Sequence, residues 1–264
     1  MKPEDIERIK EILPTDLGSE EIRTQIASDI LRRSVFSARM ASAPYLEKVR
    51  DLCTQLISGE INESTVRAGL ETCLASMGHS PLDGGGLENP ASIRRLNLII
   101  DTQREMASSV ARITEQTDAT VYLYPAWKLT RFETRAVPRT DWALRWRAAG
   151  ESVGWHGATP REMVALKDSP IWQALGDGVG GFKDTLGNPY PPFAYSSGLD
   201  WIEVDRATCI RLGLIDGNSA ESTNRPIDES TNPPSLAPTA EQVANARARY
   251  GFDVFAGLDF GGIV

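Results

Sequence analysis

One long amphipathic segment, residues 89–117, constrains the fold more than any other part of the chain. Pro90 stands where a first helical residue tolerates proline, and apolar residues then recur at helical spacing. These positions are Ile93, Leu96, Ile99, Ile100, Met106, Ala107, Val110 and Ile113. At about 100° per residue they cover roughly 160° of arc, which suits a helix packed on a globular core better than a two-stranded seam. Leu98 points the other way, which predicts cover on a second side.

Gln103 projects from the middle of this apolar stripe. A buried amide without hydrogen-bond partners costs on the order of 1–3 kcal/mol. We therefore expect the Gln103 side chain to be hydrogen-bonded to a neighbouring part of the chain.

The overall composition excludes several classes of protein. The 264 residues carry a formal net charge of −8, so the overall balance does not favour a nucleic-acid partner. The N-terminus is charged throughout, and no window approaches the roughly 18 apolar residues of a membrane span, which predicts a cytoplasmic protein. Cys53, Cys73 and Cys209 are too widely spaced for a disulfide framework or paired zinc ligands, and we expect free thiols.

The first 117 residues are predicted to form a helical bundle that includes the long helix. Expected helices cover residues 3–13, 20–40, 45–59 and 63–77, and Gly78 is the expected left-handed stop of the fourth. The short connections between them predict antiparallel neighbours.

Residues 118–215 are predicted to form a small α+β module. Strands are expected within residues 121–138 and 151–155 and at 199–204. Helices are expected at 140–150, before 163–166, at 171–175, and at 206–212 after an Asp205 cap. All six tryptophans lie between Trp127 and Trp201, which predicts an aromatic core. Residues 216–264 are polar and proline-rich at first and are expected to form a linker, a short helix and an extended C-terminal arm.

A cluster of arginines follows the first expected strand of the module. Arg131, Arg135, Arg139, Arg145 and Arg147 surround Trp142 in an otherwise acidic protein. Such a group can bind a phosphate or an acidic neighbour, or pair within its own domain with Glu133, Asp141 and Glu151. We favour pairing within the domain or with a partner protein.

Catalytic signals are weak. His79 follows a helix-ending glycine, and His156 lies between glycines beside a tryptophan. Neither accompanies a G-x-S-x-G element, so serine hydrolysis is not expected. An enzyme, if this were one, would centre on His156 with Glu162 or Asp177.

Five segments, taken in order, resemble phage minor head proteins of the Mu F-like head-morphogenesis group. They are ILRRSVFSARMASAPYLEKVRDLCTQLISGEINESTVRAGLETCLASMG, RRLNLIIDTQREMA, YPAWKLTRFETRAVPRTDWALRWRAAG, MVALKDSPIWQAL and NPYPPFAYSSGLDWIEVDRATCIRLGL. The likeness extends from Ile30 to Leu214. No single motif is diagnostic, and the order and spacing of the segments carry the resemblance.

The resemblance implies a function in the phage head. Proteins of this group combine a helical N-terminal region with a compact α+β module, and they act at the portal in head assembly or DNA delivery. The expected partners are therefore the portal and other capsid proteins, with indirect contact to packaged DNA and none to a membrane. The expected location is the host cytoplasm during assembly and then the virion head. We expect a structural protein rather than an enzyme, with no cofactor.

The family pattern also implies roles for several residues. Its central helix ends an apolar run with Arg and Thr-Asn, and the matching positions here are Arg94 or Arg95, Thr102 and Gln103. Since Gln keeps the amide, we expect Gln103 to join the helix to adjoining loops. Many members close their module with His and Cys-x-Cys, which suggest metal, whereas this chain has PPFAYSSGLDW and no metal is expected. Pro191, Pro192 and Phe193 are expected to pack on Trp201 instead.

Two other classes of function stay open beside the head protein. One is the enzyme centred on His156, either a hydrolase acting on a phage or host polymer or a transferase-type toxin. The other is a host regulatory protein that only binds a partner.

Overall fold

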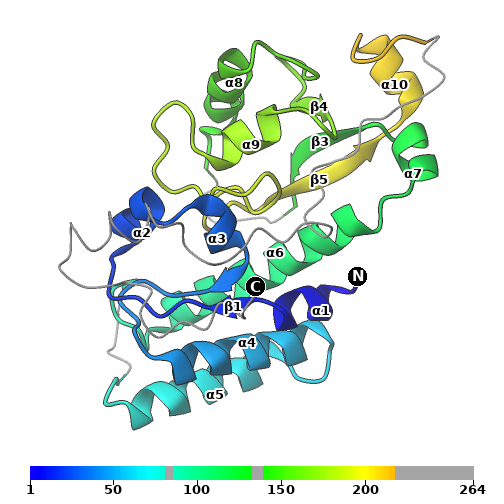
Figure 1. The fold of residues 1–264 in the computed structure, drawn as a ribbon. Helices are drawn as coiled ribbons and strands as arrows, with labels where there is room; N and C mark the ends of the chain where they lie inside the picture. Colours follow the sequence, from blue (N-terminus) through cyan, green and yellow to red (C-terminus); the bar gives the residue numbers. More distant parts are fainter. Residues whose placement is uncertain (81–85, 133–138, 218–264) are drawn as a thin grey trace, which may run out of the picture. The chain divides into compact units, whose positions relative to one another are not determined.

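The computed structural model of the chain describes residues 1–80, 86–132 and 139–217 (Figure 1). The expected mixed α+β class is confirmed. The chain forms two compact units that divide within the long helix, between Ala107 and Ser108, whereas the sequence placed a boundary after Thr117. We call them the N-terminal unit and the C-terminal unit. The expected arm, residues 216–264, lies outside the described residues except for Asp216 and Gly217.

The N-terminal unit is mainly helical. Its helices are α1 (Pro3–Arg8), α2 (Ser19–Gln25), α3 (Ser28–Arg32), α4 (Ala43–Ile57), α5 (Glu63–Ser76) and the first part of α6 (Ile93–Thr114). The expected helices at 45–59 and 63–77 are confirmed as α4 and α5. Side chains of Ser42 and Asn62 cap them by accepting hydrogen bonds from backbone N–H groups in the first turn. Gly78 follows α5 with φ of 85°, as its role as a stop requires.

Residues from α4, α5 and α6 form the main core of this unit. Its fully covered members include Tyr45, Leu46, Val49, Val66, Leu70, Leu74, Leu96 and Ile100. A second apolar cluster joins α2 and α3 to the chain before them through Leu13, Leu17, Ile22, Ile26, Ile30 and Leu31.

The predictions for residues 3–13 and 20–40 are wrong in extent. A short parallel pair, β1 (Glu11–Ile12) and β2 (Ser34–Val35), replaces the ends of both expected helices. Ile26 has an extended backbone (φ −103°, ψ 130°) and separates α2 from α3. Pairing between distant segments therefore overrides the helical pattern of the sequence.

Helix α6 begins at Ile93, so the expected start at Pro90 is wrong. The Ser92 hydroxyl accepts a hydrogen bond from the Arg95 N–H and acts at the start of the helix. Ile93 itself is exposed and lies outside the apolar stripe. The expected positions that are buried are Leu96, Ile100, Met106, Ala107, Val110 and Ile113.

The C-terminal unit contains a three-stranded antiparallel sheet in the order β4-β3-β5. The strands are β3 (Ala126–Arg131), β4 (Val164–Leu166) and β5 (Leu199–Val204), and the helices are α7 (Asp118–Leu123), α8 (Trp142–Ser152), α9 (Ile171–Gly176) and α10 (Arg206–Arg211). Strand β5 and the Asp205 cap of α10 are confirmed. The expected strand at 151–155 is wrong, because α8 extends to Ser152 and turns follow it. The first part of 121–138 is also not strand, because Thr117 caps α7 there.

The two faces of this sheet carry different cores. Trp127 and Trp201 stack on one face, with ring centroids 3.8 Å apart, and Trp172 of α9 packs against both. The aromatic core expected from the sequence is confirmed. On the opposite face, a smaller apolar cluster joins all three strands to α10 and the chain after it through Ala126, Val164, Leu166, Val204, Cys209 and Leu214.

None of the helices described is long and apolar enough to cross a membrane. Cys53, Cys73 and Cys209 are free thiols, as expected.

Candidate functional site

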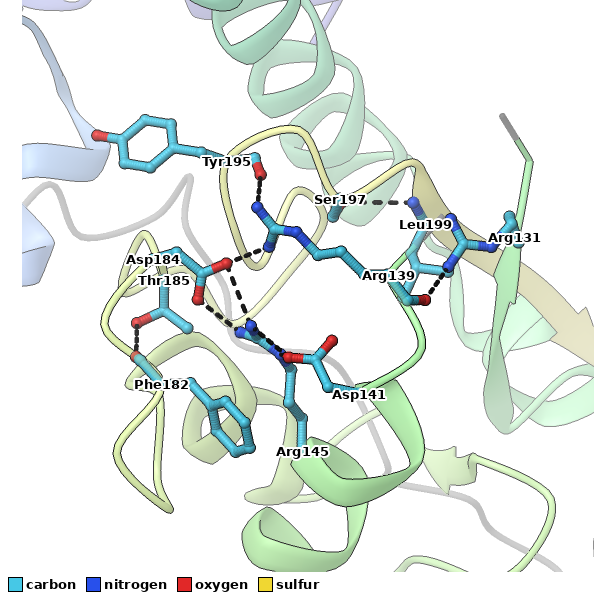
Figure 2. Close-up of polar contacts among 10 residues, drawn as sticks. All are labelled: Arg131, Arg139, Asp141, Arg145, Phe182, Asp184, Thr185, Tyr195, Ser197 and Leu199. Atoms are coloured by element: carbon cyan, nitrogen blue, oxygen red, sulfur yellow. Dashed lines mark hydrogen bonds and ion pairs between the residues drawn. The ribbon is translucent and has the colours of Figure 1, made fainter. Parts of the chain in front are cut away.

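Asp184 accepts hydrogen bonds from Arg139 and Arg145, two arginines of residues 131–147, which we call the basic segment (Figure 2). The Arg145 Nη1 and Nη2 atoms lie 2.8 and 3.1 Å from the two carboxylate oxygens of Asp184. The Arg145 Nε donates to Asp141 Oδ2 at 2.9 Å, one helical turn away. Arg139 Nη1 pairs with Asp184 as well. A single carboxylate thus holds two guanidinium groups, one of them in a bidentate pair.

Arg145 is buried, with 6% of the residue exposed. Its guanidinium lies 4.3 Å from the centre of the Phe182 ring and 5.0 Å from that of Trp142. Burial favours a lower pKa for Arg145, but the hydrogen bonds to Asp184 and Asp141 outweigh it and raise the pKa. Burial would likewise raise the pKa of Asp184, but Arg145 and Arg139 bring it below its usual value. Both groups are therefore held in their charged forms.

The network joins three segments that are distant in sequence. Arg139 Nη2 donates to the Tyr195 carbonyl at 2.8 Å, which connects the start of α8 to the chain before β5. Arg131 Nη2 donates to the Arg139 carbonyl at 2.8 Å, so the two ends of the β3–α8 connection meet (Figure 2). Asp184 contributes the segment after α9. The arrangement adds side-chain hydrogen bonds to irregular chain in which the Tyr195 N–H already donates to the Asp184 carbonyl.

Internal pairing of the basic segment is therefore confirmed for Arg139 and Arg145, with Asp141 among the expected acids. Asp184 was missed, since it lies in a loop without periodicity and about 40 residues away in sequence. Arg135 and Glu133 lie outside the described residues, while Arg147 is exposed on α8. Arg131 is also exposed, so it can still reach a partner, whereas the guanidinium of Arg145 is enclosed.

Replacing Asp184 with Asn is expected to lower the free energy of unfolding by about 1–3 kcal/mol at neutral pH. Because the Asp184 pKa is lower in the folded protein than its usual 3.8, the ionised carboxylate stabilises the fold above pH 3.8. That contribution is lost as the pH falls through the lowered pKa. Urea titrations at several pH values should show the difference between wild type and Asp184→Asn shrinking below pH 3.8. A constant difference down to pH 2 would contradict this role.

The expected packing of the proline turn on Trp201 is confirmed for Phe193. The Phe193 and Trp201 ring centroids lie 6.1 Å apart at 62°, and Phe193 is fully buried. The Asn188 side-chain amide donates to the Pro192 carbonyl at 3.0 Å and fixes the turn from within. Apolar packing of Phe193 and the hydrogen bond from Asn188 thus stabilise this turn of the C-terminal unit.

Arg95 of α6 connects this helix to loops of the N-terminal unit through several hydrogen bonds. Its guanidinium donates to the carbonyls of Leu87, Glu88 and Ala38. It also donates to the Ser37 hydroxyl at 2.8 Å. Burial lowers the pKa of Arg95 from its usual value. The implied loop-binding role thus falls largely on Arg95, whereas its neighbour Arg94 is exposed and Thr102 is buried.

Gln103 is buried and has the hydrogen bond that its place in the apolar stripe requires. Its Oε1 accepts from Lys10 Nζ at 2.5 Å, and Lys10 lies in the loop after α1. The same ammonium lies 2.7 Å from a carboxylate oxygen of Glu7, which is fully buried. Burial raises the pKa of Glu7, although Lys10 and Arg50 oppose the shift. Gln103 therefore completes a buried polar cluster that the sequence did not reveal.

The geometry around His156 differs from the expected catalytic group. His156 is exposed, and its carbonyl accepts a hydrogen bond from the Ser169 hydroxyl at 2.7 Å. The neighbouring acid is Asp168, whose pKa is raised by burial and lowered in part by His156. Asp177 instead accepts from Gln173. The described contacts do not pair His156 with either Glu162 or Asp177.

The described residues hold no group of three or more His, Cys, Asp or Glu side chains suited to a metal ion. Comparison of the chain with protein-family models, curated proteins and solved structures finds no match.

Proposed function

We propose that this protein is a minor head protein of a phage or prophage, associated with the portal or the capsid interior. It acts in head morphogenesis or DNA delivery, in the host cytoplasm during assembly and then in the virion head. The observation that carries the proposal is the ordered set of five segments between Ile30 and Leu214 that resembles the Mu F-like group. In this function the protein acts as a structural component and not as a catalyst.

The contacts within the chain are compatible with such a function. Two buried arginines have their partners within the chain. Arg145 pairs with Asp184, and Arg95 donates hydrogen bonds to loop carbonyls. These contacts hold segments in place instead of converging on an open space. Partner binding is then assigned to the exposed Arg131 and to the arm beyond Asp216, most of which lies outside the described residues.

Co-purification with the portal protein encoded beside this chain tests the proposal directly. We expect a stoichiometric complex on size exclusion, and we expect mass spectrometry to find the chain in purified heads. A chain that stays alone and is absent from particles would refute the proposal.

Deletion of everything beyond Leu214 is expected to leave a folded protein that no longer enters particles. The truncation keeps Leu212 and Leu214 and removes only the partly buried Ile215 from the apolar cluster around Val204 and Cys209, so thermal unfolding of the C-terminal unit should change little. Incorporation is measured by the amount of the chain in purified heads relative to the portal protein. Normal incorporation of the truncated chain would assign partner binding elsewhere.

The enzyme alternative is tested by replacing His156 with Ala. Because His156 is exposed and its backbone carbonyl accepts the hydrogen bond from Ser169, the variant keeps that bond and should be about as stable as the wild type and assemble normally. The measurement is the yield of complete heads in a phage that carries the variant. A stable variant that blocks head formation would favour chemistry at His156.

A further inference from the structure

An exposed apolar surface lies at the end of the C-terminal unit that carries α7 and α10. It consists of Tyr122 and Leu123 on α7, Ile202 on β5 and Ile210 on α10, with 41%, 55%, 41% and 40% of each residue exposed. The Arg206 guanidinium lies 4.4 Å from the centre of the Tyr122 ring, which joins the two helices. Figure 1 shows α7 and α10 beside each other near the end of β5. We call these four residues the α7–α10 surface.

The chain leaves the described region at this surface. A Cβ atom placed on Gly217 would lie 3.8 Å from side-chain carbons of Ile210. The residues just before it, Leu212, Leu214 and Ile215, pack against the apolar cluster around Val204 and Cys209. The remaining chain, residues 218–264, therefore starts next to the exposed apolar side chains.

The end of that chain has the composition to cover them. The sequence FDVFAGLDF, residues 252–260, carries Phe252, Val254, Phe255 and Phe260 within nine residues. Exposed aromatic and aliphatic side chains contact water unfavourably, so their burial under another apolar segment is stabilising. The acidic Asp253 and Asp259 of the same segment suit the basic Arg206 and Arg211 on α10.

We propose that residues 252–260 dock on the α7–α10 surface of their own chain. About 34 residues separate Gly217 from Phe252, enough to reach any point of the unit, since an extended chain spans roughly 3.3 Å per residue. A tethered segment meets its site at a high effective concentration, which favours its own chain over a second copy.

Site-specific crosslinking in the full-length protein tests the docking. The photoreactive residue p-benzoylphenylalanine replaces Phe255, and in a control it replaces Ser230, between the surface and the segment. Illumination of monomer isolated by size exclusion should join position 255 to peptides that contain residues 122–124 or 202–211. An equimolar mixture of isotope-labelled and unlabelled chains separates crosslinks within one chain from those between copies.

A matched pair of surface variants makes the result specific. Leu123→Asp, which places a charge in the apolar contact, should lower the yield of this crosslink at least about tenfold. Leu144→Asp, at a similarly exposed leucine on α8, should leave the yield unchanged. Crosslinks that form between copies, map elsewhere, or persist in Leu123→Asp would overturn the proposal. Because the readout needs no portal protein, failure of the proposed head function would leave this result standing.

Discussion

Replacing Trp172 with Ala is expected to lower the free energy of unfolding of the C-terminal unit by about 3–5 kcal/mol. Trp172 is the centre of the aromatic core, with ring centroids of Trp127, Trp146, Phe193 and Trp201 at 5.6–6.1 Å. Its Nε1 also donates to the Leu166 carbonyl at 2.8 Å. Truncation would open a cavity between the sheet and α8 and leave that carbonyl without its donor.

Tryptophan fluorescence during urea unfolding gives a selective measurement, because all six tryptophans belong to the C-terminal unit. Trp172→Phe keeps most of the ring contacts, loses the hydrogen bond and should cost less than the Ala variant. Phe132→Ala is the control, since 59% of Phe132 is exposed and its loss should change stability by less than about 0.5 kcal/mol. Equal effects of Trp172→Ala and Phe132→Ala would show that Trp172 is not central to the core.

Local signals in the sequence predicted local structure well. Helices α4, α5 and α10 have capping residues at their starts and glycines after their ends, and these interactions span only a few residues. The short segment LDWIEV predicts a strand, and β5 has these bounds. Concentration of tryptophan within one stretch similarly predicted the aromatic core, since large apolar rings must be buried somewhere.

Pairing between distant segments was not predictable in the same way. The parallel contact of β1 with β2 involves only two residues of each strand, so neither shows a strand pattern, and both were assigned to helices. The buried cluster of Glu7, Lys10 and Gln103 joins positions about 93 residues apart. Gln103 was suspect because of its place in the apolar stripe, but nothing in the sequence identified Lys10 as its partner.

In the candidate site, too, the sequence did not identify the main partner of the basic segment. Internal pairing was expected because positive charge concentrated in an acidic chain needs counter-ions, and Asp141 lies one turn from Arg145. Asp184 supplies most of the pairing, yet it belongs to a loop whose position depends on α9 and the chain after it. Only the folded chain brings the two arginines to one carboxylate.

Replacing Arg145 with Ala should lower the free energy of unfolding by about 2–4 kcal/mol, because it breaks a buried ion pair and leaves two carboxylates close together. The estimate lies below the full value for buried pairs, since the side chains of Asp141 and Asp184 are each 33% exposed and can gain water. Arg145→Lys keeps the charge but loses the bidentate geometry and should lie between Ala and wild type. Urea unfolding followed by fluorescence measures all three proteins.

Arg147→Ala provides the control on the same helix, because Arg147 is exposed and its loss should cost less than about 0.5 kcal/mol. Comparing Arg145→Ala with Arg147→Ala also separates an effect on stability from an effect on partner binding. If Arg145 only holds the fold, Arg145→Ala should bind the portal protein in proportion to its folded fraction. If it instead lost portal binding while unfolding like Arg147→Ala, Arg145 would contact the partner directly, and the network with Asp184 would not be its main role.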